Sequence, residues 1–487
     1  MKRNRLLVGK LPPSERFKGR AGFGFCLLLI AYCLLITTSC KKDSFITSEF
    51  ARVTITTDSL KYDTVFATTG SVTKSFKIIN ENNQKLRLSK IQLMGGANSA
   101  FKMNVDGIAT HEINNLDIEA NDSIYVFVSV TINPNVANLP FIVSDSILIN
   151  YNSNNRYVQL QAYGQNANFL SNRVITGNVA WTNNLPYVIL GSLRIDTTAS
   201  LTIQPGCRIY SHANAPFIVD GTLTVNGTFL NHVVFTGDRL DEGYKDLPAG
   251  WPGIYFRGSS KDNVLTFAVV KNAYQAIVTE KPSLNANPKV ILKQCIVDNA
   301  YDAGIYCVNS SLRADNCLIS NCGSNIILSY GGVYNFTHCT VVAYSNTYLN
   351  HKNPVLNVNN FTEQTGTLLT ADLNAVFRNS IFWGSEGLVD NEVVINKQGA
   401  NPFTVLFENN IYRVINDPAN STLTNNLKNA DPLFDTVDVN KRIFDFRITK
   451  NAFSPGINAG VFTGFFRDLD DNNRNVGLPD IGCYEKQ

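Results

Sequence analysis

Three stretches of the sequence, ILKQCIV (residues 291–297), RADNCLI (313–319) and NFTHCTV (335–341), repeat one pattern at intervals of 22 residues. Each stretch has an apolar residue, a cysteine three positions later and a β-branched aliphatic residue two positions after that. A simple strand would place inward residues at every second position, so the additional residue before each cysteine predicts a tight corner. Internal periods of about 20–50 residues are typical of solenoids and propellers.

The pattern extends in both directions and defines three columns of inward residues. The first column is Leu265, Leu292, Ala314, Phe336, Phe377 and Phe407; the second is Ala268, Cys295, Cys317, Cys339, Ser380 and Asn410; the third is Val270, Val297, Ile319, Val341, Phe382 and Tyr412. The position before the second column, which we name the corner column, holds Phe267, Gln294, Asn316, His338, Asn379 and Asn409. Asparagine tolerates left-handed backbone geometry and stacked asparagines can form ladders, so we interpret His338 as a ladder residue in an asparagine position.

Further likenesses extend the repeat toward the N-terminus. PYVILGSLRI (186–195) returns thirty residues later as PFIVDGTLTV (216–225), and GIY (304–306) resembles the strand start in WPGIY (251–255). Residues 343–374 are read as an irregular insertion, with His351 and Lys352 at its surface. About ten coils, each rising by one strand spacing of ~4.8 Å, are expected between residues 170 and 415.

With these columns, residues 167–430 resemble the right-handed parallel β-helix of the pectate-lyase-like family, and the handedness is implied by that resemblance alone. Residues 431–487 resemble the C-terminal cap of choice-of-anchor Q β-helix proteins through SPGINAG (454–460), DLDDNNR (468–474) and PDIGCYE (479–485). The resemblance implies a cap over the open end of the solenoid, where an uncovered sheet edge would promote aggregation.

Short alternating runs punctuated by Asn, Gly, Asp and Pro fill residues 51–166 and predict a β-sandwich of about seven strands. NEN (80–82), LRL (86–88) and AYGQ (162–165) resemble the immunoglobulin-like modules that precede β-helices in bacterial surface lipoproteins. The predicted fold class is therefore all-β, with an N-terminal Ig-like sandwich followed by a right-handed parallel β-helix solenoid.

The first 39 residues have the form of an export signal. Seven Lys/Arg and one acid in residues 1–20 precede the uncharged run AGFGFCLLLIAYCLLITTS (21–39), which favours a signal peptide over a membrane-spanning anchor, although its length allows either. TTSC (37–40) resembles a bacterial lipobox. We therefore expect Cys40 to be lipidated, residues 40–50 to be a tether, and the protein to be an outer-membrane lipoprotein facing the periplasm or the cell exterior.

Composition excludes several classes of function. Charged residues make up 17% of the 487 residues, against about 25% in ordinary domains, which argues against long helical proteins. The net charge of +3 comes from the basic leader, so the exported part is mildly acidic and nucleic acid is not an expected partner. Seven cysteines remain after the leader and Cys40 are set aside, and this odd number, with their inward spacing, favours buried free thiols.

No complete catalytic motif is present. The nearest constellation of the polysaccharide-lyase kind is Lys271, Asp298, Asp302, Arg313 and Asp315, in which Lys271 and Asp298 occupy equivalent positions of successive coils. The alternative is a solvated ion pair on the flank of the solenoid. Asp468, Asp470 and Asn472 offer oxygens for Ca²⁺, the one cofactor that the sequence suggests, but no Gly and no following Glu complete an EF-hand, which favours a cap-stabilising turn.

Aromatic residues near coil surfaces are the remaining candidates. Tyr274, Tyr301, Tyr306 and Trp383 are predicted to stack on sugars. The sequence thus predicts a lipid-anchored cell-surface protein that binds an extended polymer, most plausibly polysaccharide, without catalysis. Two alternatives stay open: a polysaccharide lyase or glycoside hydrolase acting on uronate-containing glycans, and a structural adhesin or assembly component.

Overall fold

The computed structural model describes residues 44–66, 71–132, 141–241, 243–384, 388–448, 450, 453–474 and 476–487. The predicted leader and Cys40 lie outside these residues. In the described part of the chain nearly every regular element is a strand, and no helix there is long and apolar enough to cross a membrane. The chain divides into two compact units, the first built from residues up to 60, 74–128 and 145–160, and the second from the remainder.

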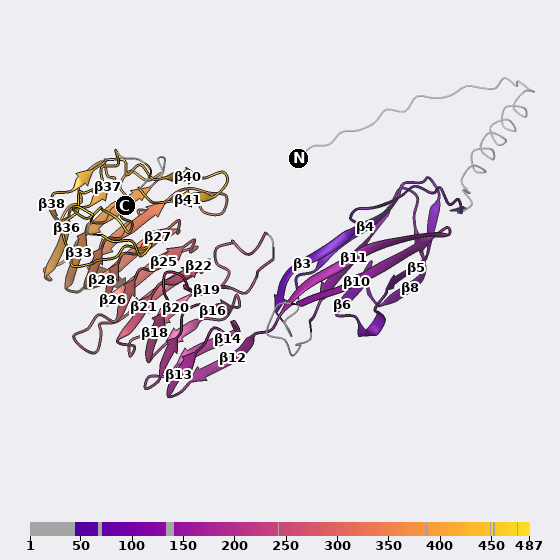
Figure 1. Ribbon diagram of the computed structural model, residues 1–487, viewed down its shortest axis with the longest axis horizontal. Helices are drawn as coiled ribbons and strands as arrows, with labels where there is room; N and C mark the ends of the chain where they lie inside the picture. Colours follow the sequence, from indigo (N-terminus) through magenta and orange to yellow (C-terminus); the bar gives the residue numbers. More distant parts are fainter. Residues whose placement is uncertain are drawn as a thin grey trace, which may run out of the picture. The chain divides into compact units, whose positions relative to one another are not determined.

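The N-terminal strands form two sheets, which agrees with the predicted sandwich (Figure 1). One sheet has the order β1-β5-β10-β11-β3 with β8 added beside β5, and the other has the order β2-β4-β9-β6-β7. The elements are β1 (Phe45–Ile46), β2 (Val53–Ile55), β3 (Ser59–Phe66), β4 (Lys74–Asn80), β5 (Lys85–Leu93), the 3-10 turn Gly96–Asn98, β6 (Phe101–Val105), β7 (Ile108–Ala109), β8 (Glu112–Ile118), β9 (Ser123–Val130), β10 (Phe141–Tyr151) and β11 (Asn154–Gln165). Burial alternates along β9, as expected of a strand with one face in a core.

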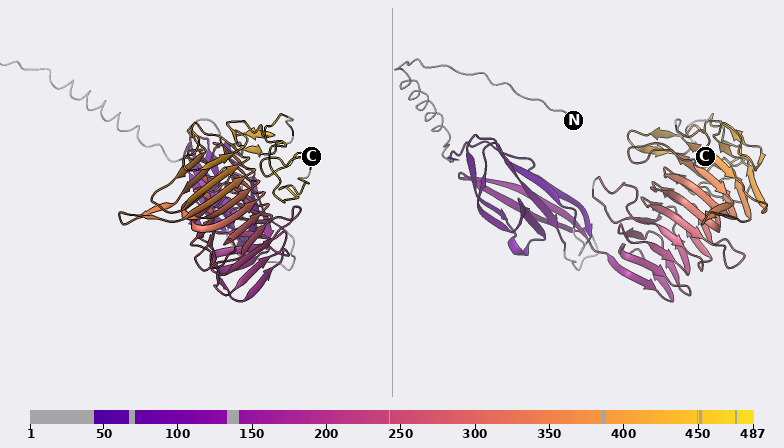
Figure 2. Two further views of the ribbon diagram at one scale, coloured as in Figure 1. Left: turned by 90° about the vertical axis from the view of Figure 1, so that its left-hand side faces the viewer. Right: turned by 180° about the vertical axis from the view of Figure 1, so that it is seen from behind.

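The following strands form one continuous parallel ladder, the solenoid (Figures 1 and 2). Its strands are β12 (Asn168–Ile175), β13 (Asn178–Trp181), β14 (Tyr187–Ile195), β15 (Ser200–Ile203), β16 (Arg208–Ser211), β17 (Phe217–Val219), β18 (Thr222–Asn226), β19 (Val233–Gly237), β20 (Ile254–Phe256), β21 (Asn263–Thr266), β22 (Ala268–Lys271), β23 (Gln275–Glu280), β24 (Val290–Lys293), β25 (Ile296–Asp298), β26 (Ala303–Asp315), β27 (Leu318–Ser320), β28 (Ser324–Thr337), β29 (Thr340–Ala343), β30 (Leu356–Asn359), β33 (Leu373–Arg378), β34 (Ile381–Gly384), β35 (Val393–Asn396), β36 (Phe403–Glu408), β37 (Ile411–Tyr412), β38 (Thr422–Thr424) and β39 (Leu427–Lys428). This parallel β-helix confirms the predicted fold class.

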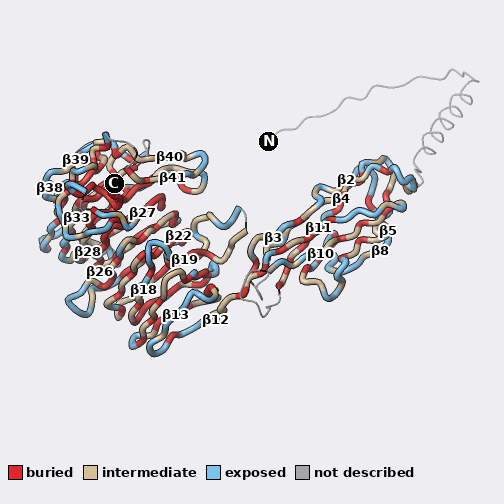
Figure 3. Tube along the Cα trace, in the orientation of Figure 1, coloured by how far each residue is buried: buried red, intermediate tan, exposed pale blue. Residues whose placement is uncertain are grey.

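The predicted winding register is confirmed residue by residue. Leu292 pairs with Ala314, and Ala314 pairs with Phe336 one coil further on. Every residue of the three inward columns is at most 2% exposed, and buried segments run along the solenoid strands in Figure 3. The cysteines of the second column are free buried thiols, which behave there as small apolar groups.

The corner column also has the expected backbone. All six residues have positive φ, between 46° and 54°, the left-handed region in which Asn costs little and a β-branched residue costs most. This explains why four of the six are Asn or His, since these residues adopt left-handed backbone geometry more readily than most.

Two finer predictions were wrong. The thirty-residue likeness does not mark stacked positions, because Tyr187 pairs with Ile209 and Leu193 pairs with Phe217, so the coil there is 22–24 residues long. Residues 343–374 are not wholly an insertion either, because β30 lies in the ladder between β28 and β35. Residues 344–355 and the hairpin of β31 (Phe361–Gln364) and β32 (Thr367–Thr370), orange in Figure 2, lie outside the ladder.

The C-terminal segment covers one side of the solenoid. It contains the hairpin β40 (Thr436–Asp438) and β41 (Ile443–Asp445). Its apolar residues pack on the outward side chains of β27, β29, β34 and β37, namely Leu318, Val342, Ile381 and Ile411. The resemblance implies a cap over the open end; the contacts of this segment run along the side, where the outward side chains are apolar and require a cover.

The same segment follows the corner column from coil to coil. Gln294 Nε2 donates to Asp468 O at 2.7 Å, Asn379 Nδ2 donates to Val461 O at 2.7 Å, and Asn409 Nδ2 donates to Ala459 O at 3.0 Å. Most corner side chains thus form hydrogen bonds with the C-terminal segment rather than with one another. These contacts join residues far apart in sequence and hold the segment on the solenoid.

Candidate functional site

Two exposed tyrosines from successive coils lie side by side on the solenoid. The ring centroids of Tyr274 and Tyr301 are 5.8 Å apart, with an interplanar angle of 24°. Tyr274 is 45% exposed and Tyr301 is 52% exposed, so each ring keeps about half of its surface in water. The sequence prediction that these two residues present aromatic surface is consistent with this placement.

The backbone beneath these rings is fixed by the coil. Tyr274 lies just before β23 and Tyr301 just before β26, and each follows a buried alanine, Ala273 or Ala300. The amide of Tyr274 donates to Trp251 O at 2.7 Å, and the amide of Tyr301 donates to Ala273 O at 2.9 Å. Both rings therefore leave from rigid, hydrogen-bonded positions rather than from a loose loop.

Two further tyrosines lie on the adjoining sheet face. Tyr255 in β20 pairs with Val278 in β23, which pairs with Tyr306 in β26, so the two tyrosines share one outward column two coils apart. Next to Tyr255 is an open hollow of about 280 Å³ lined by Pro216, Ile218, Tyr255, Phe256, Arg257, Val278 and Glu280. We name Tyr255, Tyr274, Tyr301 and Tyr306 the tyrosine face.

One of the predicted acids belongs to this face. Gln275 Nε2 donates to Asp302 Oδ2 at 2.7 Å. Burial raises the pKa of Tyr255, and the charges of Tyr274 and Asp302 raise that pKa further. Sequence reasoning missed Tyr255 and Gln275, although the likeness between residues 251–255 and 304–306 was a usable signal for Tyr255.

The remaining predicted acids and bases fall into two separate groups. Lys271 and Asp298 are register neighbours, as expected, and Ser320 Oγ donates to Asp298 Oδ1 at 2.7 Å. Burial raises the pKa of Asp298, while the Ser320 hydrogen bond and the charge of Lys271 lower it. Arg313 and Asp315 pair with each other, Nε to Oδ2 at 2.8 Å, on the strand before the corner. The five predicted residues therefore have different partners and do not gather around one point.

Trp383 lies apart from the tyrosine face. It stands on the outward side of β34, where it packs against the buried cluster of Ile381, Ile411 and Ile481 and is only partly exposed. Its ring contributes to the packing of the C-terminal segment, so it offers no open sugar platform.

The predicted Ca²⁺ ligands already have partners in the chain. Asp468 is 1% exposed, and its two oxygens accept the amides of Asn472 at 2.7 Å and Glu485 at 2.8 Å. Asp470 makes a bidentate pair with Arg447. Among the described residues no three His, Cys, Asp or Glu side chains are grouped as a metal site. These contacts favour the stabilising turn.

His351 is not at the surface as expected. It is 4% exposed, and its Nε2 lies 2.8 Å from Oε1 of the fully buried Glu392. Glu392 Oε1 also lies 3.7 Å from Arg413 Nη1. The loop that carries His351 folds inward, because a buried carboxylate requires hydrogen-bonding partners.

The comparisons with known proteins assign no family. No protein-family model matches the chain, and no curated protein matches it. A family 123 glycoside hydrolase from Clostridium perfringens is 12% identical over 27% of this chain with a TM-score of 0.19, and the chain spans about 30% of that enzyme's length. A PapD-like domain of human CEP192 is 11% identical, with a TM-score of 0.17, over 26% of this chain and 92% of that domain. Likeness at this level assigns no function.

Proposed function

We propose that the protein binds an extended polysaccharide along the tyrosine face without cleaving it. The observation that carries this proposal is the nearly parallel, half-exposed pair Tyr274 and Tyr301, held on rigid backbone one coil apart. Flat aromatic rings offer the apolar surface on which the C–H faces of sugar rings stack, and few other exposed groups do so at so small an entropic cost.

The spacing of the face suits a polymer. Successive coils are separated by ~4.8 Å, and the outward column places Tyr255 and Tyr306 two coils, ~9.6 Å, apart. These steps are close to the lengths of one and two sugar units in an extended chain. Asp302 and Gln275 supply polar groups beside the rings, so that hydroxyl groups of a sugar can be bonded while its ring stacks.

The proposal includes a position at the cell surface. A basic leader followed by TTSC at residues 37–40 supports lipidation of Cys40 and attachment to the outer membrane. Metabolic labelling with a palmitate analogue tests this: label is expected on the wild type and absent from Cys40→Ser, whereas equal labelling of both would refute the anchor.

Binding is tested on a glycan array with the exported part of the chain. The double variant Tyr274→Ala/Tyr301→Ala is expected to lose at least tenfold in affinity for the polysaccharide bound by the wild type, since two stacking contacts are removed. Tyr157→Ala is a matched control, because Tyr157 is 47% exposed in β11. Equal binding by all three proteins would reject the tyrosine face as the binding site. No binding to any glycan would reject the proposal in favour of a structural adhesin.

A uronate-specific lyase is the second candidate. The register neighbours Lys271 and Asp298 favour it, since a base beside a carboxylate of raised pKa is a feature of proton-transfer sites. Incubation with polygalacturonate and alginate, followed by ultraviolet absorbance of unsaturated products, decides between the two candidates. A Ca²⁺-dependent rate abolished by Lys271→Ala would establish the enzyme.

A further inference from the structure

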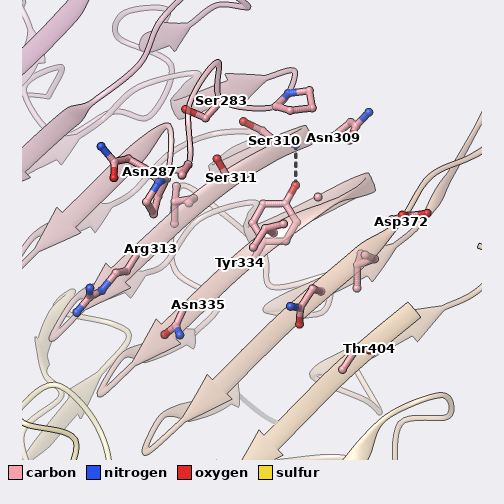
Figure 4. A pocket seen from close by; sticks show the side chains of 18 of the residues that line it. Ser283, Asn287, Asn309, Ser310, Ser311, Arg313, Tyr334, Asn335, Asp372 and Thr404 are labelled. Carbon is pink, nitrogen blue, oxygen red and sulfur yellow. Dashed lines mark hydrogen bonds between the residues drawn. The ribbon is translucent and has the colours of Figure 1, made fainter. Parts of the chain in front are cut away.

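A second, larger hollow lies on a different face of the solenoid (Figure 4). It is an open groove of about 760 Å³ across the outward side of β26, β28, β33 and β36. Strand β26 contributes to both faces, with Tyr306 in its first half and Ser311 and Arg313 in its second. The two halves are separated by a corner at Asn309, where φ is 43° and the register shifts.

The floor of the groove combines polar and apolar side chains. Ser311, Val333, Asn374 and Thr404 form one outward column over four coils, and Arg313 and Asn335 lie in the next outward row. Val333 is 59% exposed. Beneath them Tyr334 is 2% exposed, and its hydroxyl accepts the amide of Ser310 at 3.2 Å and donates to Gly331 O at 2.9 Å, so the floor is rigid (Figure 4).

One wall is the loop of residues 282–288, which the structure fixes at two points. Asp262 accepts hydrogen bonds from the side-chain amides of Asn285 at 2.9 Å and Asn287 at 2.8 Å. Lys289, fully buried at the end of the loop, donates from Nζ to Arg257 O at 3.1 Å, Gly258 O at 3.1 Å and Glu280 O at 2.8 Å. This wall is ordered before any ligand arrives, which lowers the entropic cost of binding.

The opposite wall is fixed in the same manner. Asn401 Nδ2 donates to Asp372 Oδ1 at 2.8 Å, and Thr370 Oγ1 donates to Asn401 Oδ1 at 2.6 Å. Two pinned walls over a rigid floor distinguish this groove from an accidental gap between loops.

The lining selects the class of ligand. Ten of the twenty lining residues carry amide or hydroxyl side chains, and the two charged lining residues, Arg313 and Asp372, have opposite signs. The groove therefore favours a neutral ligand that offers both hydroxyl groups and apolar C–H faces. An extended peptide could not add as a strand, because β26, β28, β33 and β36 are each paired with neighbours on both sides. Three coil steps, ~14 Å, separate Ser311 from Thr404.

We propose that this groove is a second saccharide site, which takes a short neutral oligosaccharide of about three units between the 282–288 wall and Asp372. It is independent of the tyrosine face, since no residue is shared between them. Asn335 and Asn374 would bond sugar hydroxyls, and Val333 would contact the C–H face of one ring.

The test is saturation-transfer NMR with a panel of trisaccharides: cellotriose, mannotriose, maltotriose, chitotriose and, as the acidic arm, trigalacturonate. At least one neutral trisaccharide is expected to bind the wild type and the Tyr157→Ala control. Val333→Arg, which fills the groove from an exposed position, and Asn374→Ala are each expected to weaken that binding at least tenfold. Circular dichroism confirms that both variants are folded.

Three results would overturn the inference. They are binding of trigalacturonate alone, no binding by any trisaccharide, and binding that survives Val333→Arg and Asn374→Ala but is lost in Tyr274→Ala/Tyr301→Ala. The last result would assign the saccharide to the tyrosine face. Failure of the tyrosine-face proposal is a separate observation, because it is read from polymer binding on the array.

Discussion

Asn379 donates a hydrogen bond from Nδ2 to Nε2 of His338 at 3.0 Å, so a histidine occupies one step of the corner column. The Nδ1 atom of His338 lies 3.2 Å from Asp480 O. The ring nitrogen that faces a carbonyl must carry the proton and the one that faces a donor must accept, which assigns the neutral tautomer protonated on Nδ1.

Acid should weaken the fold through His338. Burial and the positive charge of Arg474 hold the pKa of His338 well below its usual range. The unfolded chain takes up a proton near pH ~6.5, so the stability contributed by the neutral ring is complete above that pH and is lost as the pH falls below it. We expect urea midpoints to fall more steeply between about pH 7 and pH 5 in the wild type than in His338→Asn. Parallel pH dependences would contradict this, since the nearby buried carboxyls are common to both proteins.

Lys289 should be a large contributor to the stability of the coil around it. Burial lowers its pKa to about 8, and three backbone carbonyl oxygens accept hydrogen bonds from its Nζ. Lys289→Met leaves those buried acceptors without a donor, at a cost of about 2–4 kcal/mol in the free energy of unfolding. Lys261→Met, at an exposed position, should change it by less than about 0.5 kcal/mol. Similar denaturation curves for the two variants would show that the three hydrogen bonds are weak.

Arg474 should fasten the C-terminal segment to the solenoid. Its side chain is fully buried, with Nη1 3.1 Å from Glu485 Oε2 and Nε donating to Asn316 Oδ1 at 2.9 Å. Arg474→Met leaves Glu485 without its cation, which costs about 3–5 kcal/mol for a buried pair. Limited proteolysis should then release the segment after residue 431, whereas the exposed control Arg467→Met should resist as the wild type does. Equal resistance to proteolysis in both variants would show that Arg474 does not hold the C-terminal segment on the solenoid.

The seven described cysteines, Cys207, Cys295, Cys307, Cys317, Cys322, Cys339 and Cys483, should be unreactive in the folded protein. All are buried and free, and burial raises the pKa of Cys307 to about 12, so little thiolate forms. A thiol-specific chromogenic reagent should detect almost none before denaturation and all seven afterwards. Rapid labelling of two or more under native conditions would contradict this, and labelling of Cys295, Cys317 or Cys339 would mean that the second inward column is open to solvent.

The sequence was sufficient to predict which residues line the interior of the solenoid, but it was insufficient to predict what packs on its exterior. Cys295, Cys317 and Cys339 reveal the winding because stacked inward positions recur at a fixed spacing, and positive φ at Asn316 follows from local backbone preference. The position of the C-terminal segment could not be inferred in this manner, since the contact between Arg474 and Asn316 joins residues 158 positions apart.

The candidate sites show the same division. Tyr274 and Tyr301 could be selected because the coil register places them near the coil surface. The groove could not be predicted in this manner. Its walls depend on Asp262, Lys289 and Asn401, which do not occupy equivalent positions in the repeat. Arg313 was predicted to belong to a lyase-like group with Asp298, but it lines the groove instead.

The decisive measurement is a crystal structure of the protein with an oligosaccharide of six units cut from the polysaccharide bound on the array. Electron density for sugar rings is expected against the exposed surfaces of Tyr274 and Tyr301, continuing past Tyr255 or Tyr306. An ordered ligand seated only elsewhere, with both rings still in open solvent, would contradict the proposed function.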